Sequence, residues 1–417
     1  MIFLKRGFLR SVRSEYPTQF WLLFWGLMIS TIGSSMIWPF LMIYVSKKLA
    51  LADTAAASLM TINASFGLIF AFVAGPLTDR LGRKWVMVVS LAMNGVIYLL
   101  MSQASTLLHF QLLMVLTGVF NPLYRIGADA MMADLIPPEK RPEAYSLLRT
   151  SNNVGVALGP AIGGFIASAS YTIAFIIAAA GMIIYSLLVS FRARETLPQH
   201  SHAASAGPLE LLRGYKTIGR DRRFVAFVIT YTLNQVCAAL IWILLGMYAN
   251  KHYQISESLY GFIPMTNALM VVFFQVFVTR WTKRFPALWM LALGTFFYAI
   301  GTGSVALGHS FWAFWLSMVV ITTGELISTP TATTLVANLA PADMRGRYMS
   351  IYGLTWNVAA GIGPLYGGIL SDNFGPVYTW YGGLGVGLVS VAAFIAMAQL
   401  LRTIRPAETK ALTLSEK

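Results

Sequence analysis

Residues 133–164 read ADLIPPEKRPEAYSLLRTSNNVGVALGPAIGG, and residues 337–368, 204 positions later, read ANLAPADMRGRYMSIYGLTWNVAAGIGPLYGG. Aligned without gaps, 11 of these 32 positions are identical. Apolar segments often match by coincidence, but here proline, arginine, asparagine and paired glycines coincide at a fixed spacing. We therefore expect the chain to contain two copies of one structural unit.

The composition around this repeat indicates an integral membrane protein. Of the 417 residues, 57% are hydrophobic and 11% are charged, and the mean hydropathy is +0.66. Soluble domains carry about 25% charged residues. A soluble fold cannot bury so much apolar surface, so the excess must face lipid.

Apolar runs long enough to cross a bilayer occur twelve times. Because backbone groups inside a bilayer must bond to one another, each run is expected to be a helix. The prediction is an all-α membrane protein with two pseudo-symmetric bundles of six helices, residues 1–191 and 224–417, joined by a cytoplasmic linker at 192–223. The spans are 17–46, 54–78, 85–104, 108–135, 142–168, 171–191, 224–250, 257–280, 286–307, 311–339, 345–371 and 376–401.

The basic residues indicate how the spans are oriented. Of 30 Lys and Arg residues, 25 fall in the segments that share a side with the N-terminus, whereas the opposite loops hold only Lys47, Lys48 and Lys251. By the positive-inside rule both termini are cytoplasmic, in a bacterial inner membrane. The net charge of +14 therefore reports topology and predicts no nucleic-acid partner. The first run is too long for a signal peptide, so it is read as a retained span.

Several classes of chemistry have no support in the sequence. The single cysteine, Cys237, excludes disulfides, and the five histidines include only one close pair, so we expect no metal site. The spans hold no catalytic pair, and the largest insert is too short for a receptor domain, so neither an enzyme nor a scaffold is expected. Two parallel repeats with a central site are instead typical of a secondary transporter that works by alternating access, without a cofactor.

Two motifs carry a family resemblance. The loop after the second span reads Gly75-Pro-Leu-Thr-Asp79-Arg80-Leu-Gly82-Arg83-Lys84, and the fifth span carries Gly155-x-x-x-Gly159-Pro160-x-x-Gly163-Gly164. The first resembles the signature of the major facilitator superfamily, and the second resembles the motif of its twelve-span drug:proton antiporters. The resemblance implies a proton-coupled exporter of the multidrug type, driven by the proton gradient.

Each motif also has a physical reading. Asp79 can accept bonds from a helix N-terminus and from Arg83 or Arg80, and Asp134 and Arg141 extend this charge cluster, which would act as a conformational latch on the inner face. The alternative is a basic loop that only sets topology. In the fifth span the glycines allow close helix approach and the proline bends the helix, which serves either plain packing or gating.

Four charges lie deep in spans and are candidates for proton coupling or substrate binding. Glu325 lies 14 residues before the end of its span, roughly 20 Å at 1.5 Å per residue, and is the preferred coupling carboxylate. Arg125 and Asp129 share one helix face, so they either form a closed structural bridge or handle protons and substrate. Arg149 has the same two readings. For Glu325 the alternative to proton coupling is a structural role, as a permanent ion pair or a hydrogen-bonded acid.

The chain departs from the drug-antiporter pattern at two places. Met114 precedes Gly118 in the fourth span, where those antiporters carry an arginine, and the first span offers no carboxylate. The other cavity candidates are aromatic or weakly polar, which suits hydrophobic or amphipathic small molecules. Lipid or glycolipid flipping, or sugar and metabolite efflux, are the alternatives, and a monomer surrounded by lipid is expected. These cavity candidates are Trp38, Tyr124, Asn153, Asn234, Gln235, Trp242, Trp356 and Asn357.

Overall fold

The computed structural model describes residues 15–197, 218–341 and 344–415. Within these ranges the secondary structure is helical and contains no strand. The predicted all-α membrane fold is confirmed. Most of the predicted cytoplasmic linker, residues 198–217, lies outside the described residues, as do the basic residues before Glu15.

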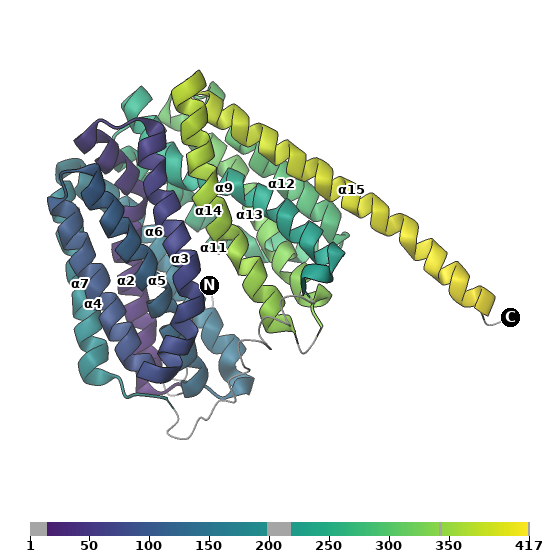
Figure 1. Ribbon diagram of the computed structural model, residues 1–417, viewed down its shortest axis with the longest axis horizontal. Coiled ribbons are helices and arrows are strands. Elements are labelled where there is room, and N and C mark those ends of the chain that lie inside the picture. Colours follow the sequence, from purple (N-terminus) through teal and green to yellow (C-terminus); the bar gives the residue numbers. More distant parts are fainter. Residues whose placement is uncertain (1–14, 198–217, 342–343, 416–417) are drawn as a thin grey trace. The chain divides into compact units, whose positions relative to one another are not determined.

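The first half of the sequence forms six long helices, close to the six predicted spans (Figure 1). A 3-10 turn, η1 (Pro138–Lys140), separates the fourth from the fifth. The helices are α2 (Thr18–Leu49), α3 (Asp53–Leu81), α4 (Arg83–Gln103), α5 (Leu107–Leu135), α6 (Arg141–Ala169) and α7 (Tyr171–Arg192).

The second half repeats this order with one interruption. The predicted span 257–280 is divided by a turn at Gly261 into a short and a long helix. A 3-10 turn, η2 (Val305–Leu307), follows the ninth span. The helices are α9 (Arg222–Tyr253), α10 (Glu257–Tyr260), α11 (Phe262–Thr282), α12 (Ala287–Ser304), α13 (Phe311–Leu339), α14 (Arg345–Phe374) and α15 (Tyr378–Ser415).

Side-chain caps begin several of these helices where the sequence places a short polar residue. The hydroxyls of Thr106, Ser170 and Ser310 each accept a bond from the backbone N–H three residues later. Asp221 accepts from the N–H groups of Arg223 and Phe224. Such caps satisfy donors that the first helical turn leaves free, which fixes the helix starts at the membrane surface.

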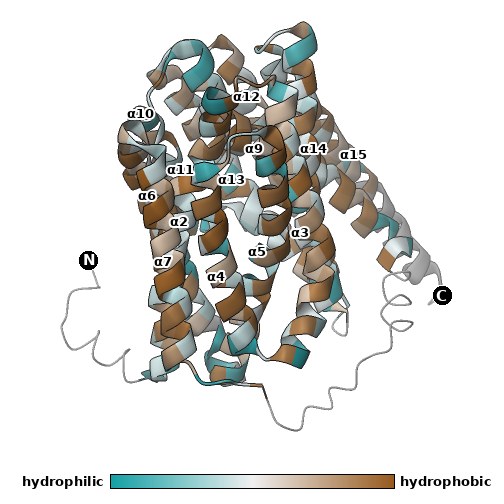
Figure 2. Ribbon diagram, turned by 60° about the vertical axis from the view of Figure 1, so that its left-hand side comes forward, coloured by the Kyte–Doolittle hydropathy of each residue, from teal (hydrophilic) through white to brown (hydrophobic). Residues whose placement is uncertain are grey.

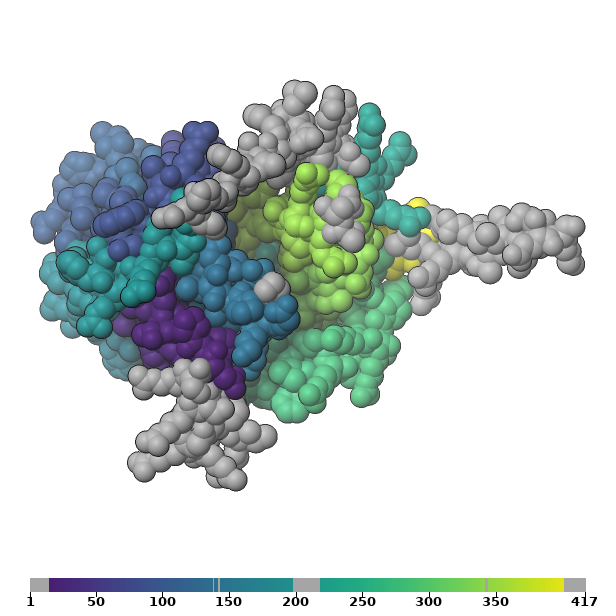
Figure 3. Space-filling view, turned by 90° about the horizontal axis from the view of Figure 1, so that it is seen from below, coloured from purple at the N-terminus to yellow at the C-terminus, as the bar shows by residue number. Residues whose placement is uncertain are grey.

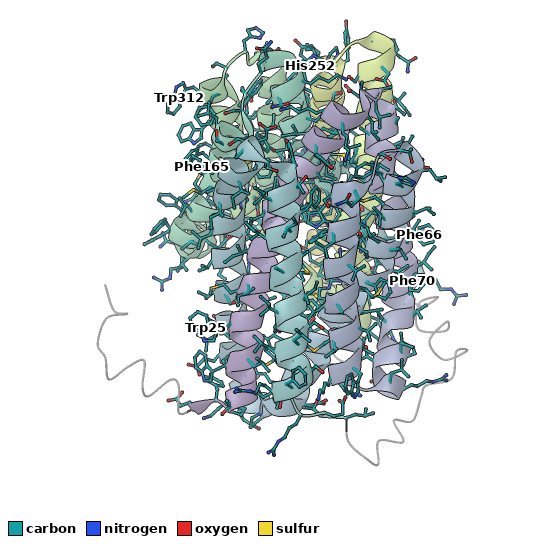
Figure 4. All side chains as sticks on the ribbon, turned by 90° about the vertical axis from the view of Figure 1, so that its left-hand side faces the viewer. Trp25, Phe66, Phe70, Phe165, His252 and Trp312 are labelled. Atoms are coloured by element: carbon teal, nitrogen blue, oxygen red, sulfur yellow. The ribbon has the colours of Figure 1, made fainter. Side chains whose placement is uncertain are left out.

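Within the described ranges, ten helical spans are long and apolar enough to cross a membrane. The two expected spans outside this set, α6 and α14, still form helices of 29 and 30 residues, but they carry the Gly-Pro motifs together with several charged and amide side chains. Hydrophobic residues recur along the helices (Figure 2). Large apolar side chains project from the helix surfaces (Figure 4), with Trp25 53%, Phe165 57% and Trp312 69% exposed. Such surfaces suit contact with lipid.

The described residues fall into two compact units. Unit 1 comprises 15–51, 62–197 and 256–268, and unit 2 comprises 52–61, 218–255, 269–341 and 344–415. Each unit therefore contains most of one sequence half and a short segment from the other half. The two exchanged segments, 52–61 and 256–268, begin 204 residues apart, which is the spacing of the repeat.

Close helix contacts and aromatic clusters form the two cores. In unit 1, α2 packs against α6 and α7, and α4 packs against α5 and α7. Tyr16, just before α2, and Phe20, in its first turn, are buried with Met132, Ile136 and Ala144. Figure 3 shows this end of unit 1, where the start of α2 is purple. In unit 2, α9 packs against α14 and α15, around a buried cluster that includes Phe224, Phe227, Tyr231, Tyr348 and Phe394.

Candidate functional site

Unit 1 encloses a cavity of about 510 Å³ among its membrane-spanning helices. The lining comes from α2, α4, α5, α6 and α7, so side chains from five helices converge on one space. Apolar groups and one tryptophan alternate with polar groups along the wall. The polar and aromatic lining residues are Ser30, Thr31, Ser34, Trp38, Asn94, Asn121, Tyr124, Arg125, Asp129, Tyr145, Arg149 and Asn152.

Three of the four candidate membrane charges line this single cavity. Arg125 and Asp129 project from α5 and Arg149 from α6, and all three are exposed to the cavity opening. The Arg125 and Asp129 side chains are not within 4.0 Å of each other, whereas described ion pairs elsewhere are at 2.6–3.3 Å. The closed structural bridge is therefore not formed here, and both groups remain open to a ligand.

The neutral polar groups extend the site away from these charges. Thr31 on α2 donates its hydroxyl to Oδ1 of Asn152 on α6 at 3.2 Å. The Tyr145 hydroxyl donates to the backbone carbonyl of Asp129 at 3.3 Å, which ties α6 to α5 beside the carboxylate. Asn94 on α4 is buried, and its Oδ1 has no partner among the described residues.

The outcome for the expected cavity residues of this half is mixed. Trp38 and Tyr124 line the cavity, but Asn153 does not, because its neighbour Asn152 takes that place. Asn152 follows Arg149 by three residues, so the two side chains lie on the same face of α6. Helical spacing outward from the charges would have found it, and likewise Asn121, four residues before Arg125.

Unit 2 holds the fourth membrane charge. Glu325 lies on α13, half-buried, close enough to interact electrostatically with the hydroxyls of Tyr231 on α9 and Tyr298 on α12. The Tyr352 hydroxyl donates to that of Tyr231 at 3.4 Å and lies 3.3 Å from the Thr333 hydroxyl. The carboxylate therefore lies in a tyrosine-rich polar cluster inside an apolar bundle.

The remaining cavity candidates belong to α9 and α14 of unit 2. Asn234 is fully buried, donates weakly to Gln235 Oε1 at 3.5 Å, and leaves its own Oδ1 unpartnered among the described residues. Trp242 and Asn357 are half-buried, and Trp356 is 38% exposed. These five candidates all belong to unit 2, and the residues that line the cavity described above all belong to unit 1.

Asp79 and Arg83 of the signature loop form a charge cluster with Asp134 and Glu195. We call these four residues the inner charge cluster, because the charge count predicts that this end of the helices is cytoplasmic. The Arg83 guanidinium contacts Asp79 at 3.3 Å and Asp134 at 3.1 Å, so the expected pairing within the motif and its extension to Asp134 are both present. The Thr196 hydroxyl also donates to Asp134 at 3.0 Å. The cluster ties together α3, the start of α4, the end of α5 and the segment after α7.

The carboxylate at the N-terminus of α4 comes from a residue outside the motif. Glu195 accepts from the backbone N–H groups of Arg83 at 2.9 Å and Lys84 at 3.1 Å. Gly82 has φ of 92°, and a Cβ on it would lie 2.3 Å from the Glu195 carboxylate. A glycine is therefore required both by the backbone and by this cap. Sequence reasoning gave the role at a helix N-terminus to Asp79 and missed Glu195.

The other motif residues have separate local roles. Arg141 donates to the carbonyls of Ile136 at 3.0 Å and Ala133 at 2.7 Å, which caps the C-terminus of α5. The Lys84 ammonium lies over the Trp85 ring at 4.9 Å, Arg80 is exposed, and Gly75 meets no neighbour. Arg141 therefore does not join the inner charge cluster.

The glycines of α6 form the surface on which α2 packs. A Cβ on Gly159 would lie 2.4 Å from the Ser35 Cβ, and one on Gly163 would lie 2.6 Å from Cα and the carbonyl oxygen of Met36. Gly155 faces Thr31 at 2.7 Å, and Gly164 meets Glu257 on α10. Within unit 1 the second motif thus acts as close helix packing, and Pro160 lies inside the same helix.

Comparison with known proteins agrees with this architecture. The Major Facilitator Superfamily model matches residues 23–239 and again residues 227–417. The MFS-type transporter YhjO of Bacillus subtilis is 23% identical over 407 residues, covering 96% of this chain and 97% of that protein. A Na⁺, Li⁺, K⁺/H⁺ antiporter of Planococcus maritimus is 26% identical, covering 79% and 84% of the two chains. The multidrug resistance protein MdtH of Escherichia coli is 22% identical, covering 89% and 91%.

Solved transporter structures share the fold. A bacterial homologue of the human lysosomal transporter Spinster, in an inward-facing and occupied conformation, has a TM-score of 0.77 at 13% identity and covers 91% of this chain and 96% of its own. A POT family transporter in complex with 5-aminolevulinic acid has a TM-score of 0.75 at 16% identity, with coverages of 93% and 97%. The chain belongs to the Major Facilitator Superfamily of membrane transporters.

Proposed function

We propose that this transporter exports small amphipathic compounds in exchange for protons. The observation that carries the proposal is the cavity of unit 1, where the Asp129 carboxylate lies in a membrane-spanning helix without a closed ion pair. A carboxyl in such a place can bind and release a proton as access alternates. Glu325, in its tyrosine-rich cluster, is the second carboxyl and our preferred coupling group.

The cavity wall indicates what the cargo looks like. Arg125 and Arg149 offer only hydrogen-bond donors, whereas Leu27, Leu91 and Leu148 offer apolar surface. A compound with an acceptor-bearing polar end and a hydrophobic body matches both surfaces. The volume of about 510 Å³ lies in the range of sites for drug-sized ligands.

The relatives supply two alternatives within the same fold. Proteins named a multidrug resistance protein and an alkali-cation/proton antiporter are each similar to this chain over most of its length. Two guanidinium groups against one carboxylate make the cavity of unit 1 net positive, which disfavours an alkali cation as cargo. The cavity chemistry therefore favours the organic compound.

The proposal is tested on purified protein in liposomes. A panel of amphipathic compounds, together with Na⁺ and K⁺, is assayed for uptake with and without an imposed pH gradient. We expect gradient-driven transport of at least one organic compound and of neither cation. The isosteric change Glu325→Gln abolishes that transport while the protein stays monodisperse, and Glu139→Gln in η1 is the matched control that preserves it.

Four results would each refute a part of this proposal. Full gradient-driven transport by Glu325→Gln removes Glu325 from coupling, and the same result for Asp129→Asn removes the second carboxyl. Transport of Na⁺ or K⁺ without transport of any organic compound would show that the protein is a cation/proton antiporter. Movement of lipid or glycolipid analogues, and of no other compound, would show that the protein is a flippase.

A further inference from the structure

Two ion pairs lie at equivalent positions of the sequence repeat. In unit 1, Lys47 at the end of α2 contacts Glu257 at the start of α10, with 2.6 Å between Nζ and Oε1. In unit 2, Lys251 at the end of α9 contacts Asp53 at the start of α3, with 2.7 Å between Nζ and Oδ1. Each residue of one pair is 204 positions from its counterpart in the other, so we call the four residues the outer ion pairs.

The two carboxylates are buried and bonded more than once. Glu257 is 5% exposed and Asp53 is 7% exposed. Glu257 Oε1 also accepts from the Tyr171 hydroxyl at 2.6 Å, and Asp53 Oδ2 accepts from the Ser371 hydroxyl. A buried carboxylate is costly without its cation, so loss of either lysine strongly disfavours the arrangement seen here.

The helix starts that carry the carboxylates also sit on equivalent glycines. A Cβ on Gly164 of α6 would lie 2.4 Å from the Glu257 carbonyl oxygen, and one on Gly368 of α14 would lie 2.8 Å from the Thr54 Cα. Gly164 and Gly368 are again 204 positions apart. In unit 2, Asp372 adds a cap by accepting from the N–H groups of Asp53 and Thr54 at 3.0 and 2.9 Å. Two separate contacts thus repeat the same design.

In both pairs the lysine and the carboxylate come from opposite halves of the sequence. Lys47 belongs to the first half and Glu257 to the second, whereas Lys251 belongs to the second and Asp53 to the first. Separation of the two sequence halves would therefore have to break both bonds and release the exchanged segments 52–61 and 256–268 from the units that hold them here. The lysines involved are two of the three cations that the charge count places on the outer side.

We propose that the outer ion pairs are a twofold-repeated gate, formed when the outer side of the transporter is closed and broken when it opens. Each pair holds the start of a helix in close contact with a glycine, which is Gly164 for α10 and Gly368 for α3. The carboxylates become hydrated only in the open state. None of the four residues lines the cavity of unit 1. They act as positioning residues that set the equilibrium between the state with the outer side closed and the state with the outer side open. This role requires no contact with the substrate or with the coupling ion.

The gate is tested by labelling a cavity residue from outside. Ser34→Cys is introduced into a Cys237→Ser background in proteoliposomes of defined orientation, and its reaction with a membrane-impermeant maleimide is timed. We expect Lys47→Met and Lys251→Met each to accelerate labelling several-fold, and the double variant to accelerate it further. Both lysine side chains are 40–51% exposed, so these changes leave the buried packing in place.

A charge exchange separates gating from a merely structural role. Lys47→Glu alone accelerates labelling, and adding Glu257→Lys returns the rate toward that of the unchanged pair; the second pair is exchanged in the same way. The matched control is Lys48→Met, because Lys48 bonds to Tyr44 and the Ser102 carbonyl within the first half. Unchanged labelling in the monodisperse Lys→Met variants overturns the proposal, and so does acceleration that the exchange fails to reverse.

Discussion

Adding a single methyl group to Gly163 should destabilise the protein, although alanine is the better helix former. The new Cβ would lie 2.6 Å from Cα and the carbonyl oxygen of Met36, whereas ordinary contact begins at 3.4 Å. Both atoms belong to the backbone of α2, so no side chain can turn away. The two helices must separate locally by up to 0.8 Å, the difference between those distances.

The expected magnitude follows from two opposing effects. Overpacking a close contact costs about 1–3 kcal/mol. Replacing glycine by alanine inside a helix returns about 0.5–1 kcal/mol. For Gly163→Ala the first effect dominates, for a net loss of about 1–2 kcal/mol. For the control Gly353→Ala on α14, where nothing lies within 4 Å of the new Cβ, only the second effect applies and stability rises.

The assay is thermal denaturation of purified protein in detergent, followed by intrinsic tryptophan fluorescence. The apparent Tm of Gly163→Ala should fall below that of the unchanged protein, and that of Gly353→Ala should equal or exceed it. If both variants have the same Tm, close packing of α6 on α2 is not what the motif provides. An unchanged Tm with an increased proton leak into liposomes would support the gating role instead.

Three further changes test other parts of the molecule. Gly82→Ala places a side chain at φ of 92°, and the strain of about 1–2 kcal/mol should lower the apparent Tm. Asp134→Asn should slow transport more than Asp79→Asn, because the side chain of Asp134 is 25% exposed and that of Asp79 is 61% exposed while both contact Arg83; initial rates in liposomes decide the order. Arg149→Gln should raise the KM for an exported compound with an acceptor-bearing end, by about tenfold for one lost charged hydrogen bond, and leave the KM for a compound without that group unchanged.

The spans and the motif geometry could be predicted because local physics determines them. A bilayer requires long apolar helices, and the predicted spans match the observed helices to within a few residues at most ends. Gly82 and Arg83 act where the motif places them. The turn at Gly261 was missed although Gly261 and Pro264 lie beside the break, because both residues are frequent inside membrane helices and the surrounding run is apolar.

Contacts between distant segments explain most of what was missed. Glu195 caps a helix whose first residue is 112 positions away, and no local pattern links the two. The cavity groups Asn94 and Tyr145 likewise depend on how three helices pack. The outer ion pairs are different, since the 204-residue spacing of the repeat, applied to the whole chain, aligns Lys47 with Lys251 and Asp53 with Glu257.

The same spacing shows that the two faces of the transporter are built on different plans. On the outer side both repeats retain a lysine and a carboxylate, and both pairs are formed. In the inner charge cluster the positions equivalent to Asp79, Asp134 and Glu195 are Lys283, Asn338 and Gln399, so none of its three carboxylates has a counterpart in the second half. The inner charge cluster therefore belongs to one repeat alone, whereas the proposed outer gate uses both repeats. Opening the outer side requires both bonds to break. A substitution in one outer pair therefore shifts the equilibrium only partly toward the open state, because the intact second pair still stabilises the closed state.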